Sequence, residues 1–209
     1  MKELEKYIGE HSEAEDPVLQ ELDRETHLRV PGARMISGHL QGQFLSMLSR
    51  LVQPMFILEL GTFTGYSAIC LAKGLREGGR LITIEKDDEL ESIALKYFKK
   101  AGMGNLIDRR TGEVLEILPG LNGPFDIVFM DADKREYPEY YRQVFGKVRK
   151  GGLIIADNTL WGGKIVNPPS LPDEQTKGII DFNALIKNDG RVEKIILPLR
   201  DGLTLIRKK

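Results

Sequence analysis

The sequence has little cysteine and little histidine. Its single cysteine, Cys70, lies in an apolar run, so we expect neither a disulfide framework nor a Cys-x-x-Cys zinc or redox site. All three histidines, His11, His27 and His39, fall within the first 39 residues. The rest of the chain has no imidazole for a Ser-His-Asp triad or a histidine-rich metal site. Acid–base chemistry in the main body must therefore use Asp, Glu, Lys or Tyr.

The sequence also lacks an excess of charge and a long apolar segment. Its 30 Lys and Arg residues balance 31 Asp and Glu residues, so no overall field favours binding to nucleic acid. No stretch approaches the roughly 18 apolar residues of a membrane span, and the N-terminus has no apolar core of a signal peptide. With 209 residues, 41% of them hydrophobic, we expect one globular cytoplasmic domain that uses neither membrane nor nucleic acid as a partner.

From residue 56 onward, short apolar runs alternate with segments of helical periodicity. The runs are rich in branched residues and lack polar alternation, which is typical of strands buried on both faces. Strand and helix in alternation predict an α/β fold with a doubly wound, mostly parallel sheet. The runs span residues 56–60, 81–84, 125–130 and 152–156, and the helical segments span 67–75, 88–101 and 135–148.

The two ends of the chain depart from this alternation. Residues 14–30 and 38–52 are predicted to be extra helices ahead of the first strand. The second of these carries Leu40, Phe44, Leu48 and Leu51 on one predicted face. At the other end, an Asp-Gly turn separates two apolar segments and predicts an antiparallel final pair of strands. We expect one domain over 1–209, with a helical part at 1–52 and an α/β core at 53–209.

A glycine-bearing turn follows the first predicted strand and opens a helix. It contains Gly61 and Gly65, but Phe63 stands where a dinucleotide-binding turn needs glycine. The carboxylate of Glu59 would repel a phosphate and attract an ammonium or sulfonium group, which favours S-adenosylmethionine over NAD. Glu85, at the end of the second strand, can accept both hydroxyls of a ribose. The alternative is a tight structural turn with a solvated glutamate.

Acidic residues follow two further predicted strands. Asp131, Asp157 and Asn158 should meet at the carboxyl edge of a parallel sheet. Their oxygen atoms form a hard donor set that suits Mg²⁺, Mn²⁺ or Ca²⁺ rather than zinc. Lys134 lies close enough to reach a hydroxyl on such a cation and to serve as a base. The alternative is that the acids, with Asp133 among them, cap helices and that the lysine is a surface charge.

These segments resemble the cation-dependent O-methyltransferases, which include catechol O-methyltransferase and caffeoyl-CoA O-methyltransferase. The motifs are ELGTFTGYS at 59–67, DADK at 131–134 and DNTLW at 157–161, and the resemblance covers nearly the whole chain. It implies the seven-stranded, Rossmann-like methyltransferase fold. It also implies a catalytic lysine, Lys134, metal ligands Asp131, Asp157 and Asn158, and a substrate side formed by Lys134 and Trp161.

The resemblance further implies a set of residues for S-adenosylmethionine. Met35 and Ser37 would lie over the cofactor, and the glycine-bearing turn would bind its methionine part. Glu85 would bind the ribose, and Glu113 and Val114 would contact adenine. The usual small residue of the family is replaced by Val114. The full implied cofactor set is Met35, Ser37, Glu59, Gly61, Thr62, Phe63, Ser67, Glu85, Glu113, Val114 and Asp131.

Together these features predict an enzyme that moves a methyl group from S-adenosylmethionine to a hydroxyl of a catechol-like or caffeoyl-type phenol, with a divalent cation. We also expect a homodimer built largely through the N-terminal half, because apolar helices precede a sheet that later helices already cover. Two alternatives stay open at this point. One is an NAD(P)-dependent oxidoreductase on a Rossmann-like sheet, and the other is a non-catalytic binding module.

Overall fold

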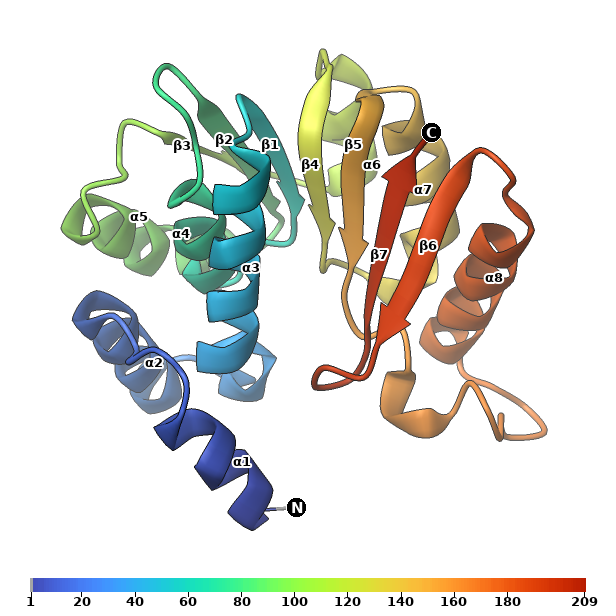
Figure 1. Cartoon of the computed structure of the whole chain (residues 1–209), viewed down its shortest axis with the longest axis horizontal. Coiled ribbons are helices and arrows are strands. Elements are labelled where there is room, and N and C mark those ends of the chain that lie inside the picture. The colour runs from blue at the N-terminus through green and yellow to red at the C-terminus, as the bar shows by residue number, and fades with distance from the viewer. Residues whose placement is uncertain (1) are drawn as a thin grey trace.

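The chain is built around one mixed β-sheet in the computed structural model, which describes residues 2–209. Over these residues the sheet has seven strands in the order β3-β2-β1-β4-β5-β7-β6 (Figure 1). Only β7 runs against the others. The expected mostly parallel sheet with an antiparallel last strand is confirmed. The strands are β1 (Phe56–Leu60), β2 (Arg80–Glu85), β3 (Ile107–Thr111), β4 (Phe125–Met130), β5 (Val148–Ala156), β6 (Val192–Leu197) and β7 (Leu203–Lys208).

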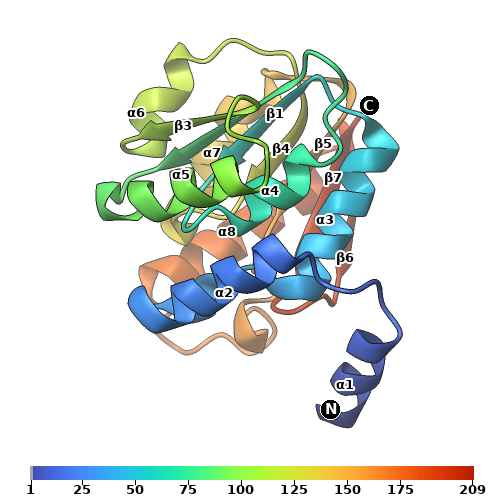
Figure 2. The same cartoon turned by 90° about the vertical axis from the view of Figure 1, so that its left-hand side faces the viewer.

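Helices cover both faces of the sheet and enclose two apolar cores (Figure 2). One core packs under α2, α3, α4 and α5, and the other under α6, α7 and α8. The first helix, α1, projects away from the rest of the chain in both views. None of the described helices could cross a membrane. The helices are α1 (Lys2–Glu10), α2 (Pro17–Arg29), α3 (Gly38–Val52), α4 (Tyr66–Ala72), α5 (Glu91–Lys100), α6 (Val114–Ile117), α7 (Tyr137–Phe145) and α8 (Glu174–Asn188).

The apolar side chains that were predicted to share one face of α3 are not buried to the same extent. Leu51 is 82% exposed, and the residues turned inward are small or polar, with Leu45 the one large apolar member. The reason is the close approach of α3 to α4. A Cβ at Gly42 would lie 2.5 Å from the Tyr66 ring and 2.8 Å from Cys70 Sγ. Large side chains cannot fit there, so small residues make the closest contact, while Phe44 and Leu48 are partly buried against the core and Leu51 is exposed.

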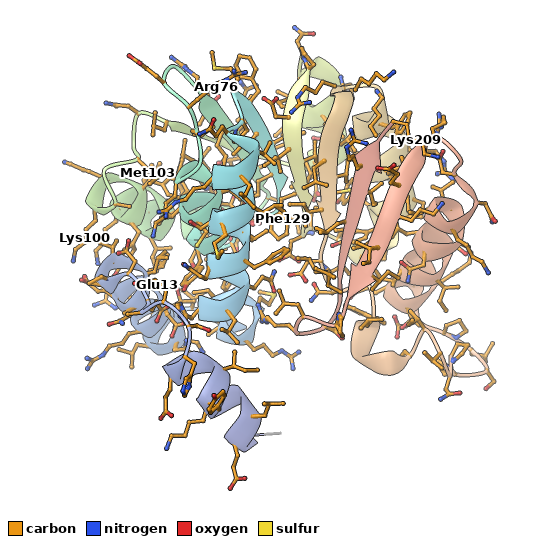
Figure 3. The ribbon with its side chains drawn as sticks, in the orientation of Figure 1. Glu13, Arg76, Lys100, Met103, Phe129 and Lys209 are labelled. Atoms are coloured by element: carbon orange, nitrogen blue, oxygen red, sulfur yellow. The ribbon has the colours of Figure 1, made fainter. Side chains whose placement is uncertain are left out.

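The strand order brings the functional segments to one edge of the sheet. The carboxyl ends of β1, β2, β4 and β5 lie at the lower edge in Figure 1, and the hairpin between β6 and β7 turns at that same edge. The connection containing Arg76 lies at the opposite edge (Figure 3). Side chains that follow four separate strands are thereby gathered around one space.

Candidate active site

A cavity of about 830 Å³ opens at this edge. It brings together nearly all the side chains that the sequence singled out. Glu59 is the exception, because it does not line the cavity wall. The expected residues that do line it are Met35, Ser37, Gly61, Thr62, Phe63, Ser67, Glu85, Glu113, Val114, Asp131, Lys134, Asp157, Asn158 and Trp161.

The glycine turn between β1 and α4 is fixed by packing as well as by backbone conformation. Gly61 and Gly65 have φ values of 95° and 93°, in the left-handed region that favours glycine. A Cβ on Gly61 would collide with the backbone oxygen of Asp131, and one on Gly65 would collide with the ring of Phe98. Both glycines are therefore required by the fold before any ligand is considered.

Glu59 lies fully buried beneath this turn, near the end of β1. Its Oε2 accepts a 2.5 Å hydrogen bond from Thr83 Oγ1, and the Thr83 and Thr62 hydroxyls are 2.5 Å apart. Its Oε1 has no hydrogen-bond partner. Burial raises the pKa of the Glu59 carboxyl from 4.5 to about 8. A cation placed close to the turn would supply the charge partner that this buried group lacks.

Glu85 stands at the end of β2 and supports the turn directly. Its Oε2 accepts the backbone N–H of Phe63 at 2.8 Å, and its Oε1 accepts the N–H of Asp87 at 3.1 Å. Further along the wall, Val114 is buried at the start of α6, while Glu113 is exposed and pairs with Lys86 at 3.9 Å. This end of the cavity thus combines carboxylates with an apolar surface.

Lys134 lies at the other end, in a 3₁₀ turn over Lys134–Glu136 that follows β4. It is only 8% exposed. Its Nζ donates to Asp131 Oδ1 at 2.6 Å and to the Tyr137 hydroxyl at 2.8 Å. Burial raises the pKa of Asp131 to about 6, with the charge of Lys134 opposing the rise. The sequence did not single out Tyr137 for this contact, because a helical tyrosine stripe is equally typical of a core.

Asp157 directly follows β5 and is 2% exposed. Its Oδ2 accepts a 2.6 Å hydrogen bond from Gln41 Nε2 of α3, and its Oδ1 accepts the N–H of Asn158 at 2.7 Å. Gln41 Oε1 in turn accepts from Arg200 Nη1 at 3.3 Å. The same guanidinium nitrogen donates to the backbone oxygen of Ser37. This chain of contacts joins α3, the residue after β5 and the β6–β7 hairpin, and no sequence pattern predicted it.

The proposed cation ligands can be tested against this geometry. Among the described residues, no three His, Cys, Asp or Glu side chains converge as a metal cluster. Asp131 and Asp157 supply two carboxylates to the cavity, and Asn158 adds an amide. Asp131 Oδ2 and the Asn158 amide have no hydrogen bond to any described residue, so they are available to a ligand. This donor set fits a hard, oxygen-preferring divalent cation and does not fit zinc.

Trp161 borders the same end of the cavity, in the short 3₁₀ segment Trp161–Gly163. Its indole Nε1 donates to Thr176 Oγ1 at 2.9 Å, which ties the segment to α8. The N–H of Gly162 donates to Asp201 Oδ1 at 2.5 Å, which ties it to the β6–β7 hairpin. The indole is therefore held in place from two sides, next to Asn158.

Comparison with known proteins identifies the group to which the chain is related. The sequence profile of a family described as O-methyltransferase matches residues 9–209. The chain belongs to the O-methyltransferase family. A curated relative, caffeoyl-CoA O-methyltransferase 1 of Eucalyptus globulus, is 36% identical over 195 residues, which cover 88% of this chain and 79% of the relative. The family expected from the motifs is confirmed.

Solved structures of other O-methyltransferases have the same fold. One from Bacillus cereus, in complex with SAH, has a TM-score of 0.90 and 30% identity, and the match covers 99% of this chain and 97% of that one. TomG from Streptomyces achromogenes, in complex with SAM, has a TM-score of 0.90 and 31% identity, with 99% and 96% covered. Membership of an O-methyltransferase family favours methyl transfer over the oxidoreductase alternative.

Proposed function

We propose that this O-methyltransferase transfers a methyl group from S-adenosylmethionine to a hydroxyl of a catechol-like or caffeoyl-type phenol, and that a divalent cation assists. One observation carries the proposal: a single cavity has the glycine turn and Glu85 at one end and Lys134, Asp131 and Asp157 at the other. The caffeoyl-CoA relative and the SAM- and SAH-bound neighbours support the donor and the acceptor class.

The cofactor end would bind S-adenosylmethionine through charge and shape. The ammonium of its methionine part would lie close to Glu59 beneath the turn, where its charge would favour the ionised form of this buried carboxyl. Glu85 would accept the ribose hydroxyls while keeping its hydrogen bond to Phe63. Val114 offers a buried apolar contact for adenine. When bound, this cofactor supplies a methyl group on a positively charged sulfur.

The cation would be held by Asp131, Asp157 and Asn158, which supply oxygen ligands of the preferred kind. When bound, such a cation lowers the pKa of a hydroxyl next to it. Gln41 fixes the carboxylate of Asp157 through its 2.6 Å hydrogen bond. The carboxylate oxygens are thereby oriented before the ligand arrives, which reduces the reorganisation needed on binding.

Lys134 would take part in the deprotonation of the acceptor hydroxyl. Its Nζ is held between Asp131 and Tyr137 at one wall of the cavity, so it can accept the proton or stabilise the negative charge on the phenol oxygen. Trp161 would cover the ring of the acceptor from the side. Because no covalent intermediate is required, alignment of donor and acceptor and the local charge supply most of the acceleration.

Cofactor binding and methyl transfer can be tested with purified protein. Calorimetry should show binding of S-adenosylmethionine or its demethylated product and no heat with NAD or NADP. A methyl-transfer screen over catechols, flavonoids and caffeoyl thioesters should give activity that EDTA removes and Mg²⁺ or Mn²⁺ restores. Tight NADH binding with no response to S-adenosylmethionine would refute the proposal.

We also propose that two copies of the chain pair through exposed apolar surface. Met47 and Leu51 point outward from α3, and Leu4 and Tyr7 are exposed on the projecting α1. Beside α3, the β5-β7-β6 end of the sheet is not covered by a described helix on this face (Figure 1). It forms a shallow hollow of about 180 Å³ with Ile195 in its wall. This surface differs from the expectation that helices cover the whole sheet.

Sedimentation velocity at micromolar concentration tests this pairing. The wild type should sediment as a dimer, and Leu51→Glu should shift it toward monomer because it places a charge in the apolar contact. Leu95→Glu is the matched control, since Leu95 is an exposed leucine of α5, which lies near β3 at the other end of the sheet (Figure 1). Monomer alone in the wild type would overturn the proposal.

A further inference from the structure

Arg200 borders the acceptor end of the cavity from the tip of the β6–β7 hairpin. The hairpin is anchored beside Trp161, because the N–H groups of Thr159 and Leu160 donate to the backbone oxygens of Gly202 and Asp201 at 3.0 Å and 2.9 Å. Its place in the cavity wall is therefore fixed by the main chain. Arg200 belongs to the wall that also carries the proposed substrate-side indole.

Arg200 forms no salt bridge with any described side chain, although its charge acts on Asp131 and opposes the rise in the pKa of that carboxyl. Arg135, Arg149 and Arg191 each pair with an aspartate. Arg200 instead uses only Nη1, and both its acceptors are neutral: the backbone oxygen of Ser37 and the amide oxygen of Gln41. Its Nε and Nη2 have no protein partner in the described structure. A guanidinium has five donors and binds a carboxylate through two of them at once.

The backbone conformation at Arg200 is also unusual for an arginine. Its φ is 50°, in the left-handed region that glycine and asparagine occupy most easily. The turn conformation alone therefore does not favour an arginine here. What holds the side chain is the contact with Gln41, a fully buried residue that also binds Asp157. The guanidinium is thereby held at a fixed place relative to the cation end of the cavity.

We propose that Arg200 binds a carboxylate on the acceptor, so that this enzyme prefers catechols that carry an acidic side chain over neutral ones. The inference rests on the proposed function, since it places the catechol hydroxyls near Lys134 and Asp131. The far end of the acceptor then points toward the hairpin. An acidic group there supplies the direct ion pair that Arg200 lacks and accepts from its unused donors.

The test compares caffeate with its methyl ester, which has the same catechol without the charge. For the wild type, kcat/KM should be higher for caffeate than for the ester. In Arg200→Gln the ratio of the two values should fall by about tenfold, the scale of one lost charge-assisted hydrogen bond in a partly exposed position. Arg200→Lys should keep part of the preference, because it keeps the charge and loses the bidentate geometry.

Arg76→Gln is the matched control, since it removes an exposed arginine at the opposite edge of the sheet (Figure 3) and should leave the ratio unchanged. Calorimetry with S-adenosylhomocysteine tests whether Arg200 binds the carboxylate of the cofactor instead of a carboxylate on the acceptor. An equal or higher kcat/KM for the ester in the wild type would overturn the inference. So would weaker S-adenosylhomocysteine binding in Arg200→Gln with an unchanged ratio. Absence of methyl transfer to every catechol would instead refute the proposed function.

Discussion

Replacing Glu59 with glutamine should change how the stability of the cofactor-free protein depends on pH. The buried carboxyl has a pKa of about 8, against 4.5 in an unfolded chain. Between these values the folded protein keeps a proton that the unfolded chain releases, so rising pH favours unfolding. The full difference corresponds to up to about 5 kcal/mol, at about 1.4 kcal/mol per pH unit. This contribution is present below pH 4.5 and is lost as the pH rises through 8.

Glu59→Gln removes the loss of stability with rising pH, but it introduces a destabilisation that does not depend on pH. The amide can still accept from Thr83, but its NH₂ brings two donors to the place where Oε1 has no partner, one more than the protonated carboxyl has. An unpaired buried donor costs about 1–3 kcal/mol at every pH. The variant should therefore be less stable than the wild type at pH 5 and more stable at pH 8. The sign of the difference should reverse between these two values.

Urea denaturation of the cofactor-free proteins at pH 5, 6.5 and 8 measures this difference. The exposed Glu77 provides the control, because Glu77→Gln makes the same chemical change outside the core and should give a difference that does not vary with pH. If the difference for Glu59→Gln is also the same at all three values, the buried carboxyl does not hold a proton in the folded state. The reasoning about its role beneath the turn would then be wrong.

Three further predictions concern the turn and the proposed chemistry. Gly61→Ala should lower the free energy of unfolding by at least about 2 kcal/mol in urea denaturation, because it combines left-handed strain with a collision against the Asp131 backbone. Lys134→Ala should lower kcat by roughly 10²–10⁴ with cofactor binding retained in calorimetry, and wild-type turnover at neutral pH would refute its role as a base. Asp157→Ala should abolish cation-dependent activity, whereas full activity in EDTA would show that this carboxylate is structural.

The sheet and the site edge could be predicted because their signals are local. A strand buried on both faces is mostly apolar, and β4 is buried at every position, with Asp126 as its one charged residue. Polar residues directly after such strands must then lie at the carboxyl edge, whatever packs around them. Lys134 and Asp157 follow this rule, and they line the same cavity.

Strands and helices at the edge of the sheet are less clearly marked in the sequence. β3 pairs only with β2 and has the sequence IDRRT, in which a single residue, Ile107, is buried. An edge strand needs few apolar side chains, so no run of them marks it. The unequal burial of the apolar residues of α3 has a different origin. Helical periodicity shows which residues share a face, but the close packing at Gly42 decides which face turns inward.

The contacts that join distant elements were beyond prediction, because their members are separated by most of the chain. Gln41 and Asp157 are 116 residues apart, and Arg200 meets Gln41 across 159 residues. A glutamine within an amphipathic helix usually faces solvent, and nothing in its neighbours distinguishes this one. It becomes informative only once the sheet brings β5 and the β6–β7 hairpin against α3. A buried amide that binds a carboxylate on one side and an arginine on the other then fixes both groups. The proposed acceptor end of the cavity is therefore organised by α3, a helix that contributes none of the proposed cation ligands.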